Sequence, residues 1–246
     1  MRYLTAEEIK ELKEGDGREI LENCAGKSVR DLFAVKIFNN YIDKFFKNRT
    51  VVKLLDLGPA SGVFASQIGQ VGYKNIYGID IDDYVTTDNK KLFKEFRIAD
   101  LSWEKLPWPD NFFQVATAWC VIPHLENPFH AIREIHRVLD KNGILIFTVP
   151  NLGSKGEIER FKKTRDFKSY RATNNHIVIF TENIIKKTVL KFFKLIGVEY
   201  HVRPKIFNGF RGKIRRVIYI LSEKSPPIKQ WLGSRWGVNV VYILQK

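Results

Sequence analysis

The sequence predicts an α/β fold, with a mostly parallel sheet covered by helices on both faces. Three observations support this prediction. Short apolar runs alternate with helical patterns between residues 49 and 151, as in βαβ units. The first three of these runs end at a glycine turn or an aspartate, as buried parallel strands often do. The chain has 246 residues, 44% of them apolar or aromatic, which is enough for one large core.

The first 48 residues are expected to be helical. Thr5-Ala-Glu-Glu8 has the pattern of a capping box, so a helix is predicted from there to about Gly15. Ser28 is expected to cap a second helix, which runs to about Asn48 and carries a broad apolar stripe.

Five strands are predicted in the middle of the chain, over residues 51–57, 75–80, 96–100, 113–119 and 144–149. Helices are expected over 61–70 and 128–139, with Lys141-Asn-Gly143 ending the second.

The pattern changes after Pro150. Residues 151–175 are polar and basic without clear periodicity, and His176–Phe180 resembles a strand. Thr181 is expected to cap a helix that continues through Leu195 and stops at Gly197.

Two closing strands are predicted at the end of the chain, over residues 198–202 and 238–244. The segment between them contains a basic helix candidate, Arg211–Leu221, and a break at Pro226-Pro227.

The net charge of +14 is unevenly distributed. Residues 1–150 contain 20 basic and 21 acidic residues, whereas residues 151–246 contain 21 basic and 6 acidic ones. A one-sided basic region favours a polyanionic partner, such as nucleic acid, a phosphorylated substrate or an anionic membrane surface. A solvated basic face without a partner is the alternative.

Several classes of protein are excluded. Two cysteines, Cys24 and Cys120, make no disulfide framework, and no Cys/His cluster indicates a metal site. The acidic, amphipathic N-terminus does not have the pattern of a signal peptide, and no apolar run approaches the ~18 residues of a membrane span. A cytoplasmic location is therefore expected, with peripheral contact to a membrane as an option.

A ligand site is predicted at the carboxyl ends of the first three strands. Leu55-Asp-Leu-Gly-Pro-Ala-Ser-Gly62 is a strand-to-helix turn, where glycines allow backbone N–H groups close to a ligand. Asp80 and Asp100 end the next two strands, and ligands of open α/β sheets bind at that edge. An ordinary tight turn and a solvated acidic loop are the alternatives. A dinucleotide-binding turn is excluded because Ala60 and Val63 stand where it needs glycines.

Longer motifs then resemble a known family. The runs 106–125 and 133–143, followed by Ile144–Asn151, are similar to class I S-adenosylmethionine (SAM)-dependent methyltransferases of the type 11 group. Asp56–Gly62 resembles their glycine-rich first motif. The likeness is specific over about residues 50–151 and weaker from there to Lys246. It implies an enzyme with a Rossmann-like, seven-stranded sheet whose last strand is antiparallel.

The resemblance implies residue roles around SAM. Asp56, Gly58, Ala60, Ser61 and Gly62 would shape the pocket for its amino and carboxypropyl groups. Asp80 would bind the ribose hydroxyls, with Ile81 against the adenine. Asp100 would accept from the adenine amino group beside Leu101, and Trp119 and Cys120 would flank the methionine part.

Three departures from the family pattern stand in this sequence. Ala60 replaces the middle glycine of the first motif, and its one methyl is expected to leave binding intact. Gln114 replaces an aspartate and is expected to weaken a structural hydrogen bond. Asn142 replaces the first glycine of a pair, and asparagine tolerates the left-handed conformation.

Two histidines are candidates for the catalytic side of the site. His124 follows the fourth strand and is the best-placed general base, with packing against the cofactor loop as the alternative. His176 is a weaker candidate, for lining the acceptor pocket or for a purely structural role. Tyr170, Arg171 and Asn151 are further candidates for the pocket.

The basic C-terminal region has more than one interpretation. A basic amphipathic helix over Arg211–Leu221, with Trp231 and Trp236 nearby, is typical of a segment that lies on an anionic membrane. It also suits RNA, with aromatic side chains stacking on bases. A solvated cap over the acceptor site is the third interpretation.

These inferences combine into one methyltransferase domain over residues 1–246. Residues 1–48 are expected to cover the cofactor, 49–151 to bind SAM, and 152–246 to build the acceptor side, with a basic insertion at 204–237. The expected acceptor is a small metabolite, a glycan or a lipid-linked molecule. The alternatives are an RNA methyltransferase, or a non-catalytic protein that binds RNA or another partner.

Overall fold

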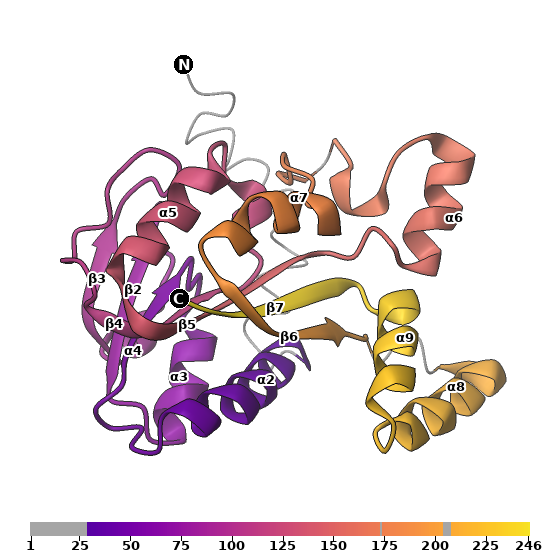
Figure 1. Cartoon of the computed structure of the whole chain (residues 1–246), viewed down its shortest axis with the longest axis horizontal. Coiled ribbons are helices and arrows are strands. Elements are labelled where there is room, and N and C mark those ends of the chain that lie inside the picture. The colour runs from indigo at the N-terminus through magenta and orange to yellow at the C-terminus, as the bar shows by residue number, and fades with distance from the viewer. Residues whose placement is uncertain (1–28, 173, 204–207) are drawn as a thin grey trace.

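A seven-stranded sheet forms the centre of the molecule in a computed structural model, which describes residues 29–172, 174–203 and 208–246 (Figure 1). The strand order is β3-β2-β1-β4-β5-β7-β6. The strands are β1 (Lys53–Leu57), β2 (Asn75–Asp80), β3 (Phe93–Ile98), β4 (Phe113–Ala118), β5 (Leu139–Pro150), β6 (Lys194–His201) and β7 (Asn239–Gln245).

The sheet is mostly parallel, as predicted. Strands β1 to β5 pair in parallel, and β7 pairs antiparallel with both β5 and β6. The antiparallel last strand confirms what the family resemblance implied.

Helices cover both faces of the sheet. They are α2 (Val29–Phe45), α3 (Val63–Gln70), α4 (Thr87–Lys90), α5 (Pro128–Val138), α6 (Lys155–Thr164), α7 (Glu182–Lys187), α8 (Gly209–Ser222) and α9 (Pro226–Trp236). Helices α2 and α3 pack on one face and α5 and α7 on the other, each over its own apolar cluster. Alternate residues of β1 serve the two clusters, since Leu54 belongs to one and Leu55 to the other.

Only part of the N-terminal region for which helices were predicted lies within the described residues. The predicted helix from Thr5 to Gly15 and its successor's cap at Ser28 lie outside the described residues. The described helix α2 packs along the sheet, where Phe38 and Ile42 are fully buried. This helix therefore supports the sheet face, and the expectation that residues 1–48 cover the cofactor stays a prediction.

The region around Gly143 differs from the prediction. Helix α5 ends at Val138, and Lys141–Gly143 lie inside β5 rather than ending the helix. The reason is a pairing of Leu139 with Phe113, which starts the strand directly after the helix. Asn142 does take the left-handed conformation, with φ of 63°.

The segment after Pro150 contains more helix than the sequence indicated. Ser154 caps α6 by accepting from the Glu157 N–H, within the stretch that lacked periodicity. The predicted break at Pro226-Pro227 lies between two helices, since α8 ends at Ser222 and Pro226 begins α9, where proline suits the first helical turn.

Two expectations in this region are wrong. His176–Phe180 is not a strand, since the N–H groups of Ile177 and Val178 donate to the carbonyl oxygen of Pro123. Gly197 does not stop a helix: α7 ends at Lys187, and Gly197 lies in β6 against Tyr41. A Cβ at this glycine would approach the Tyr41 hydroxyl oxygen to 2.6 Å, so glycine is needed for close packing.

Candidate active site

The carboxyl ends of β1, β2, β3 and β4 lie at one edge of the sheet, because these strands are parallel neighbours. The turn Gly58–Gly62 follows β1, and Asp80 ends β2. Asp100 comes two residues after β3, and Trp119-Cys120 follows β4. The fold therefore brings the predicted site residues to the edge where α/β proteins bind ligands.

Asp56 is a buried carboxylate under this edge. Its Oδ1 accepts from the Thr117 hydroxyl at 2.7 Å, and its Oδ2 has no hydrogen-bond partner among the described residues. Burial raises the pKa of Asp56 to about 7, and the nearby charge of Asp80 adds to the shift. The site thus holds a carboxyl group that would gain from a cationic ligand.

The glycine-rich turn depends on backbone conformations that L-residues rarely adopt. Gly58 and Gly62 have φ of 64° and 80°, and Ala60 between them has φ of 48°. A Cβ at Gly58 would approach Val121 Cγ2 to 2.5 Å, so this glycine lets the loops after β1 and β4 meet. Ala60 keeps the turn at some cost in backbone strain, because its Cβ disfavours the left-handed region.

Asp80 holds the same turn in place. Its Oδ2 accepts from the Ala60 N–H at 3.2 Å and its Oδ1 from the Ile81 N–H at 2.8 Å. The Gly58 N–H donates to the Ile79 carbonyl oxygen at 2.8 Å. These bonds fix the buried Asp80 carboxylate between the β1 turn and the end of β2.

Asp100 organises the turn after β3. Its Oδ1 accepts from the Ser102 N–H at 2.9 Å, and its own N–H donates to Glu104 Oε1 at 2.8 Å. Leu101, beside it, is buried. The half-buried Asp100 is therefore held at the edge by its own loop.

Trp119 and Cys120 form the fourth part of the edge. The Trp119 Nε1–H is buried without a hydrogen-bond partner among the described residues, and its ring lies edge-on to Phe64. Cys120 has a left-handed φ of 57°, and its N–H donates to Thr148 Oγ1 at 2.7 Å. Strained residues of this kind cluster at functional sites.

The structure brings His124 and His176 together although 51 residues separate them in the chain. Their rings stack with centroids 4.2 Å apart, and His124 Nδ1 lies 3.2 Å from the Asn175 carbonyl oxygen. His176 Nδ1 lies 2.5 Å from the Ser169 carbonyl oxygen. Both side chains are half-buried, so the two candidates form one imidazole pair.

The three further candidates for the pocket lie in different surroundings. Tyr170 lies beside the histidine pair and donates its hydroxyl to the Val178 carbonyl oxygen at 2.9 Å, and burial raises its pKa. Arg171 is exposed. Asn151 donates to the carbonyl oxygens of Ser234 and Gly237 at 2.8 and 2.9 Å, which makes it an anchor for α9.

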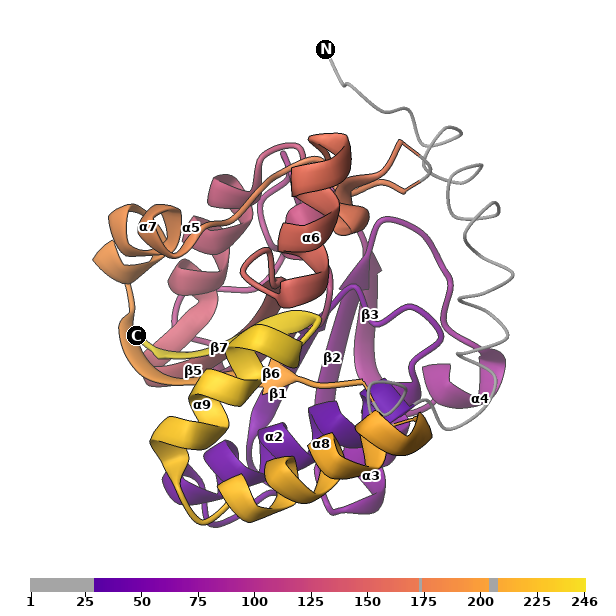
Figure 2. The same cartoon turned by 90° about the vertical axis from the view of Figure 1, so that its right-hand side faces the viewer.

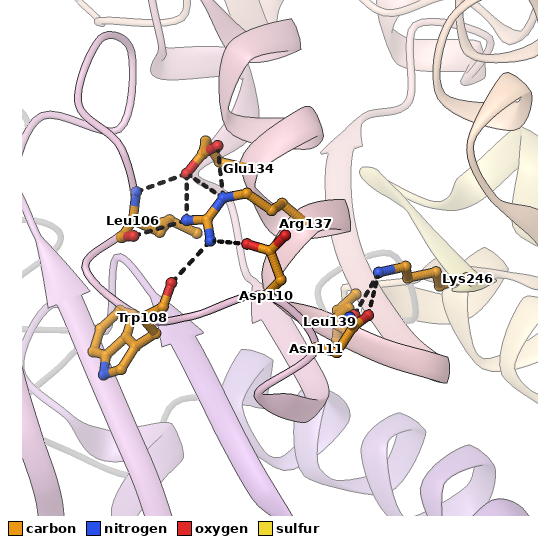
Figure 3. Close-up of polar contacts among 8 residues, drawn as sticks. All are labelled: Leu106, Trp108, Asp110, Asn111, Glu134, Arg137, Leu139 and Lys246. Carbon is orange, nitrogen blue, oxygen red and sulfur yellow. Dashed lines mark hydrogen bonds and ion pairs between the residues drawn. The ribbon is translucent and has the colours of Figure 1, made fainter.

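The motif residues that carry the family resemblance have a structural role here (Figure 3). The Arg137 guanidinium on α5 donates to the carbonyl oxygens of Leu106 and Trp108, and to the carboxylates of Asp110 and Glu134. Glu134 in turn accepts from the Leu106 N–H at 2.9 Å. This network clamps the loop before β4 to α5, which explains why the two motifs occur together.

Gln114, which replaces an aspartate of the family pattern, makes a structural hydrogen bond. Its Oε1 accepts from the Lys53 N–H at 3.0 Å and so links β4 to the start of β1. The weakening of this bond relative to a carboxylate stays a prediction.

Three polar residues at this edge, Thr117, Thr148 and Asn239, were not predicted from the sequence. Thr117 bonds Asp56, and Thr148 bonds Cys120, with Asn239 Nδ2 at 3.6 Å from Cys120 Sγ. All three lie inside or beside apolar strand runs. Only the strand register, which pairs Asp56 with Thr117, identifies such partners.

Surface hollows lie elsewhere on the molecule. One of about 440 Å³ is lined by residues of α3, of β2 and of the loop between them, such as Ser66, Ile76 and Tyr73. Another lies between α5 and α7, around Ile132 and Lys187. Neither hollow includes a residue of the carboxyl edge.

The comparisons with known proteins agree with this location. The family model described as a methyltransferase domain matches residues 55–147. A demethylmenaquinone methyltransferase from Chlorobaculum tepidum is 24% identical over 98 residues. That match covers 40% of this chain and 40% of the relative, so the chain matches under half the length of this curated relative.

Solved structures extend the likeness across the whole fold. A SAM-dependent methyltransferase from Archaeoglobus fulgidus has a TM-score of 0.58 at 16% identity, covering 93% of this chain and 99% of that one. The [4+2]-cyclase SpnF has a TM-score of 0.54 at 18% identity, covering 85% and 79%. The second structure shows that the fold alone does not specify a reaction.

The strand order, the turn after β1 and the family model all point to the same assignment. Residues 55–147 therefore match the model of a methyltransferase domain, and the described sheet has the fold of the solved SAM-dependent methyltransferases.

Proposed function

We propose that the protein is a SAM-dependent methyltransferase. The observation that carries the proposal is the convergence of Asp56, Gly58–Gly62, Asp80 and Asp100 at one sheet edge. A scaffold that served only for partner binding would not need three acidic positions there. The matched domain and its relatives support the same activity.

The residues present fit SAM chemically. The unpartnered Asp56 Oδ2, on a carboxyl group whose pKa is raised to about 7, suits the amino group of the cofactor. Gly58 and Gly62 leave no side chain on the turn, which suits close approach of the carboxypropyl part. When bound, SAM supplies a methyl group on a positively charged sulfur.

Other edge residues would hold the nucleoside. Asp80 would accept from the ribose hydroxyls, with Ile81 against the adenine. Asp100 would accept from the adenine amino group, with Leu101 packing beside the ring. Trp119 and Cys120 would flank the methionine part, and Ala60 and Ser61 would border it.

The histidine pair would serve the acceptor. Methyl transfer needs the acceptor atom in line with the methyl group, and a base only when that atom carries a proton. His124 would take this proton, and His176, stacked on it, would keep its ring in place. The carbonyl oxygens of Asn175 and Ser169 at the Nδ1 atoms would orient the two rings.

The acceptor is proposed to be a small metabolite, a glycan or a lipid-linked molecule. The curated relative from Chlorobaculum tepidum is named for a small-molecule acceptor, demethylmenaquinone, which favours this class over RNA. The location of the protein is proposed to be cytoplasmic, with contact to a membrane surface.

The test is methyl transfer from SAM labelled in its methyl group to fractionated lipids, metabolites and RNA from cells. Label in a lipid or metabolite fraction, lost when S-adenosylhomocysteine is added, is the expected result. Label in RNA alone would show that the acceptor is RNA and not a small metabolite, glycan or lipid-linked molecule. The absence of any labelled fraction, together with no SAM binding, would refute the activity.

A further inference from the structure

The helices α8 and α9 form a hairpin that extends the molecule beyond β6. In Figures 1 and 2, α9 lies next to the end of the sheet and α8 lies beside α9, on its outer side. Gly233 and Gly237 place the α9 backbone against Tyr200 of β6, and a Cβ at either glycine would come within 2.9 Å of that side chain. The hairpin is therefore packed on the sheet and has a defined outer surface.

The apolar stripe of α8 faces solvent. Phe210, Ile214, Val217 and Leu221 follow the i, i+4, i+7, i+11 spacing of one helix face. Their side chains are exposed by 80%, 48%, 56% and 63%. Ile218 and Ile220, on either side of the stripe, are exposed as well.

The opposite face of α8 is the less apolar one. Tyr219 is half-buried and Ser222 is buried, with the Ser222 hydroxyl donating to the Tyr219 carbonyl oxygen. An ordinary surface helix turns its apolar stripe toward the core. The orientation of α8 is the reverse, which is typical of a surface that contacts an apolar phase or a partner.

Helix α9 continues the exposed apolar surface. Ile228 and Trp231, three residues apart on one face, are exposed by 51% and 57%. The Arg235 guanidinium lies 5.0 Å from the Trp231 ring centre, which places a positive charge directly beside the exposed indole.

Basic residues border this surface. The segment 209–236 contains seven basic residues and one acidic residue, Glu223. The Glu223 carboxylate lies 3.9 Å from Lys36 Nζ on α2, so its charge has a partner of its own. Lys213 and Arg216 are exposed on α8, and Lys224 is exposed just after its end.

We propose that the α8–α9 hairpin docks on an anionic lipid bilayer, with the apolar stripe at the acyl boundary and the basic residues at the headgroups. An apolar face with a basic border is the arrangement of interfacial helices. RNA binding uses aromatic platforms, whereas six of the eight exposed apolar residues here are aliphatic. A second copy of the chain would bring two strongly basic surfaces together, which opposes pairing through this face.

Docking would be peripheral. No helix within the described ranges is long and apolar enough to cross a bilayer. Asn151, directly after β5, donates to the carbonyl oxygens of Ser234 in α9 and Gly237 after it. Asn239 of β7 pairs with Pro150 of β5, and its Nδ2 lies 3.6 Å from the Cys120 sulfur at the carboxyl edge. The hairpin would thus hold the candidate active site next to the membrane. The docking is independent of methyl transfer, and it deepens the proposed contact with a membrane surface by assigning the segment that makes it.

The test is sedimentation of the full chain with vesicles of phosphatidylcholine alone or mixed with phosphatidylglycerol. The wild type is expected to bind only the mixed vesicles at moderate salt. Leu221→Asp should abolish binding, whereas Val51→Asp, an equally exposed aliphatic position at 63%, should not. Neutralising Lys213, Arg216 and Lys224 to glutamine should weaken binding at least about tenfold, since each contributes near an anionic surface.

Two results would overturn the proposal. One is a wild type that does not bind anionic vesicles, and that either shifts a mixed-sequence RNA in a gel or forms dimers that Leu221→Asp disperses. The other is an equal loss of vesicle binding in the Leu221 and Val51 variants while both remain folded by circular dichroism. Calorimetric binding of SAM is measured separately, so failure of docking is distinguishable from failure of the methyltransferase assignment.

Discussion

Residues 29–150 and residues 151–246 use apolar and charged side chains in opposite ways. Among the described residues, five exposed large apolar side chains precede Pro150 and fourteen follow it. The first region has nearly balanced charge, whereas the second carries the whole basic excess. The difference indicates that the first region buries its apolar side chains and balances its charges internally. The second region exposes apolar and basic side chains that are available to a partner.

Internal networks explain why the first half resembles a family so specifically. The side chain of Arg137 is 17% exposed and binds four partners in two motifs, so any change there must be matched elsewhere. Exposed ion pairs, which constrain the sequence little, occur in both halves, as in Arg97–Glu95 and Lys186–Glu182. The family model covers the half that contains the Arg137 network and ends at residue 147.

Removing Arg137 is expected to have the largest effect on stability. Arg137→Ala would leave the Glu134 carboxylate, 14% exposed, without its cation and lower the free energy of unfolding by about 2–4 kcal/mol. Arg97→Ala, which removes an exposed pair with Glu95, should cost at most about 1 kcal/mol. Urea unfolding measures both, and equal losses would contradict the structural role of Arg137.

Asp56 should make stability depend on pH. Its pKa is raised to about 7 in the folded protein, well above its ordinary value, so the folded state keeps a proton that the unfolded chain releases. The free energy of unfolding should therefore fall as the pH rises from about 4 to about 7, and level off above. The slope from one such group is at most about 1.4 kcal/mol per pH unit.

The matched variants for this prediction are Asp56→Asn and Asp88→Asn. The first removes the buried carboxyl group and should flatten the slope between about pH 4 and 7. The second removes an exposed carboxylate of α4 and should leave the slope unchanged. Indistinguishable slopes in the two variants, measured by urea unfolding across that range, would rule out the raised pKa.

The histidine pair tests the acceptor side. With an acceptor identified by the labelling survey, His124→Ala should lower turnover about a hundredfold and leave SAM affinity nearly unchanged. His130→Ala on α5, whose ring contacts the Glu104 carbonyl oxygen, is the control and should have little effect. A pH–rate profile that keeps its acidic limb in His124→Ala would assign the pair a packing role, because the acidic limb reports protonation of the base.

Ala60→Gly is expected to have the smallest effect. It removes the Cβ from a residue with φ of 48° and restores the usual glycine of the family. Relief of strain and added freedom of the unfolded chain oppose each other, so stability should change by less than about 1 kcal/mol. Thermal unfolding and SAM calorimetry check this, and a large loss of affinity would show that the methyl group is needed in the pocket.

The sequence predicted the first half well because its signals are local. Short apolar runs that end at Gly58, Asp80 and Asp100 predict the strands and the ligand edge without knowledge of distant contacts. The second half required contacts that the sequence does not display. Gly197 resembles a helix stop until the ring of Tyr41, 156 positions away, explains it, and His176–Phe180 bonds to Pro123 instead of a strand.

The same distinction applies to the site. Charged and glycine residues at strand ends are visible in the sequence pattern. Thr117 becomes the partner of Asp56 only through the register of β1 with β4, and Thr148 becomes the partner of Cys120 only through the turn after β4. The stacking of His124 on His176 likewise depends on the loop that Glu157 holds by accepting from the N–H groups of Lys168 and Ser169.

The central claim is that the carboxyl edge binds SAM, and titration calorimetry with SAM and S-adenosylhomocysteine tests it most directly. Wild type and Asp88→Asn should bind both ligands alike, whereas Asp80→Asn should lose about 1.5–3 kcal/mol of binding free energy because the charge-assisted bonds to the ribose are gone. Thermal unfolding confirms that each variant is folded. Absence of binding by the wild type, or full affinity in a folded Asp80→Asn variant, would contradict the assignment.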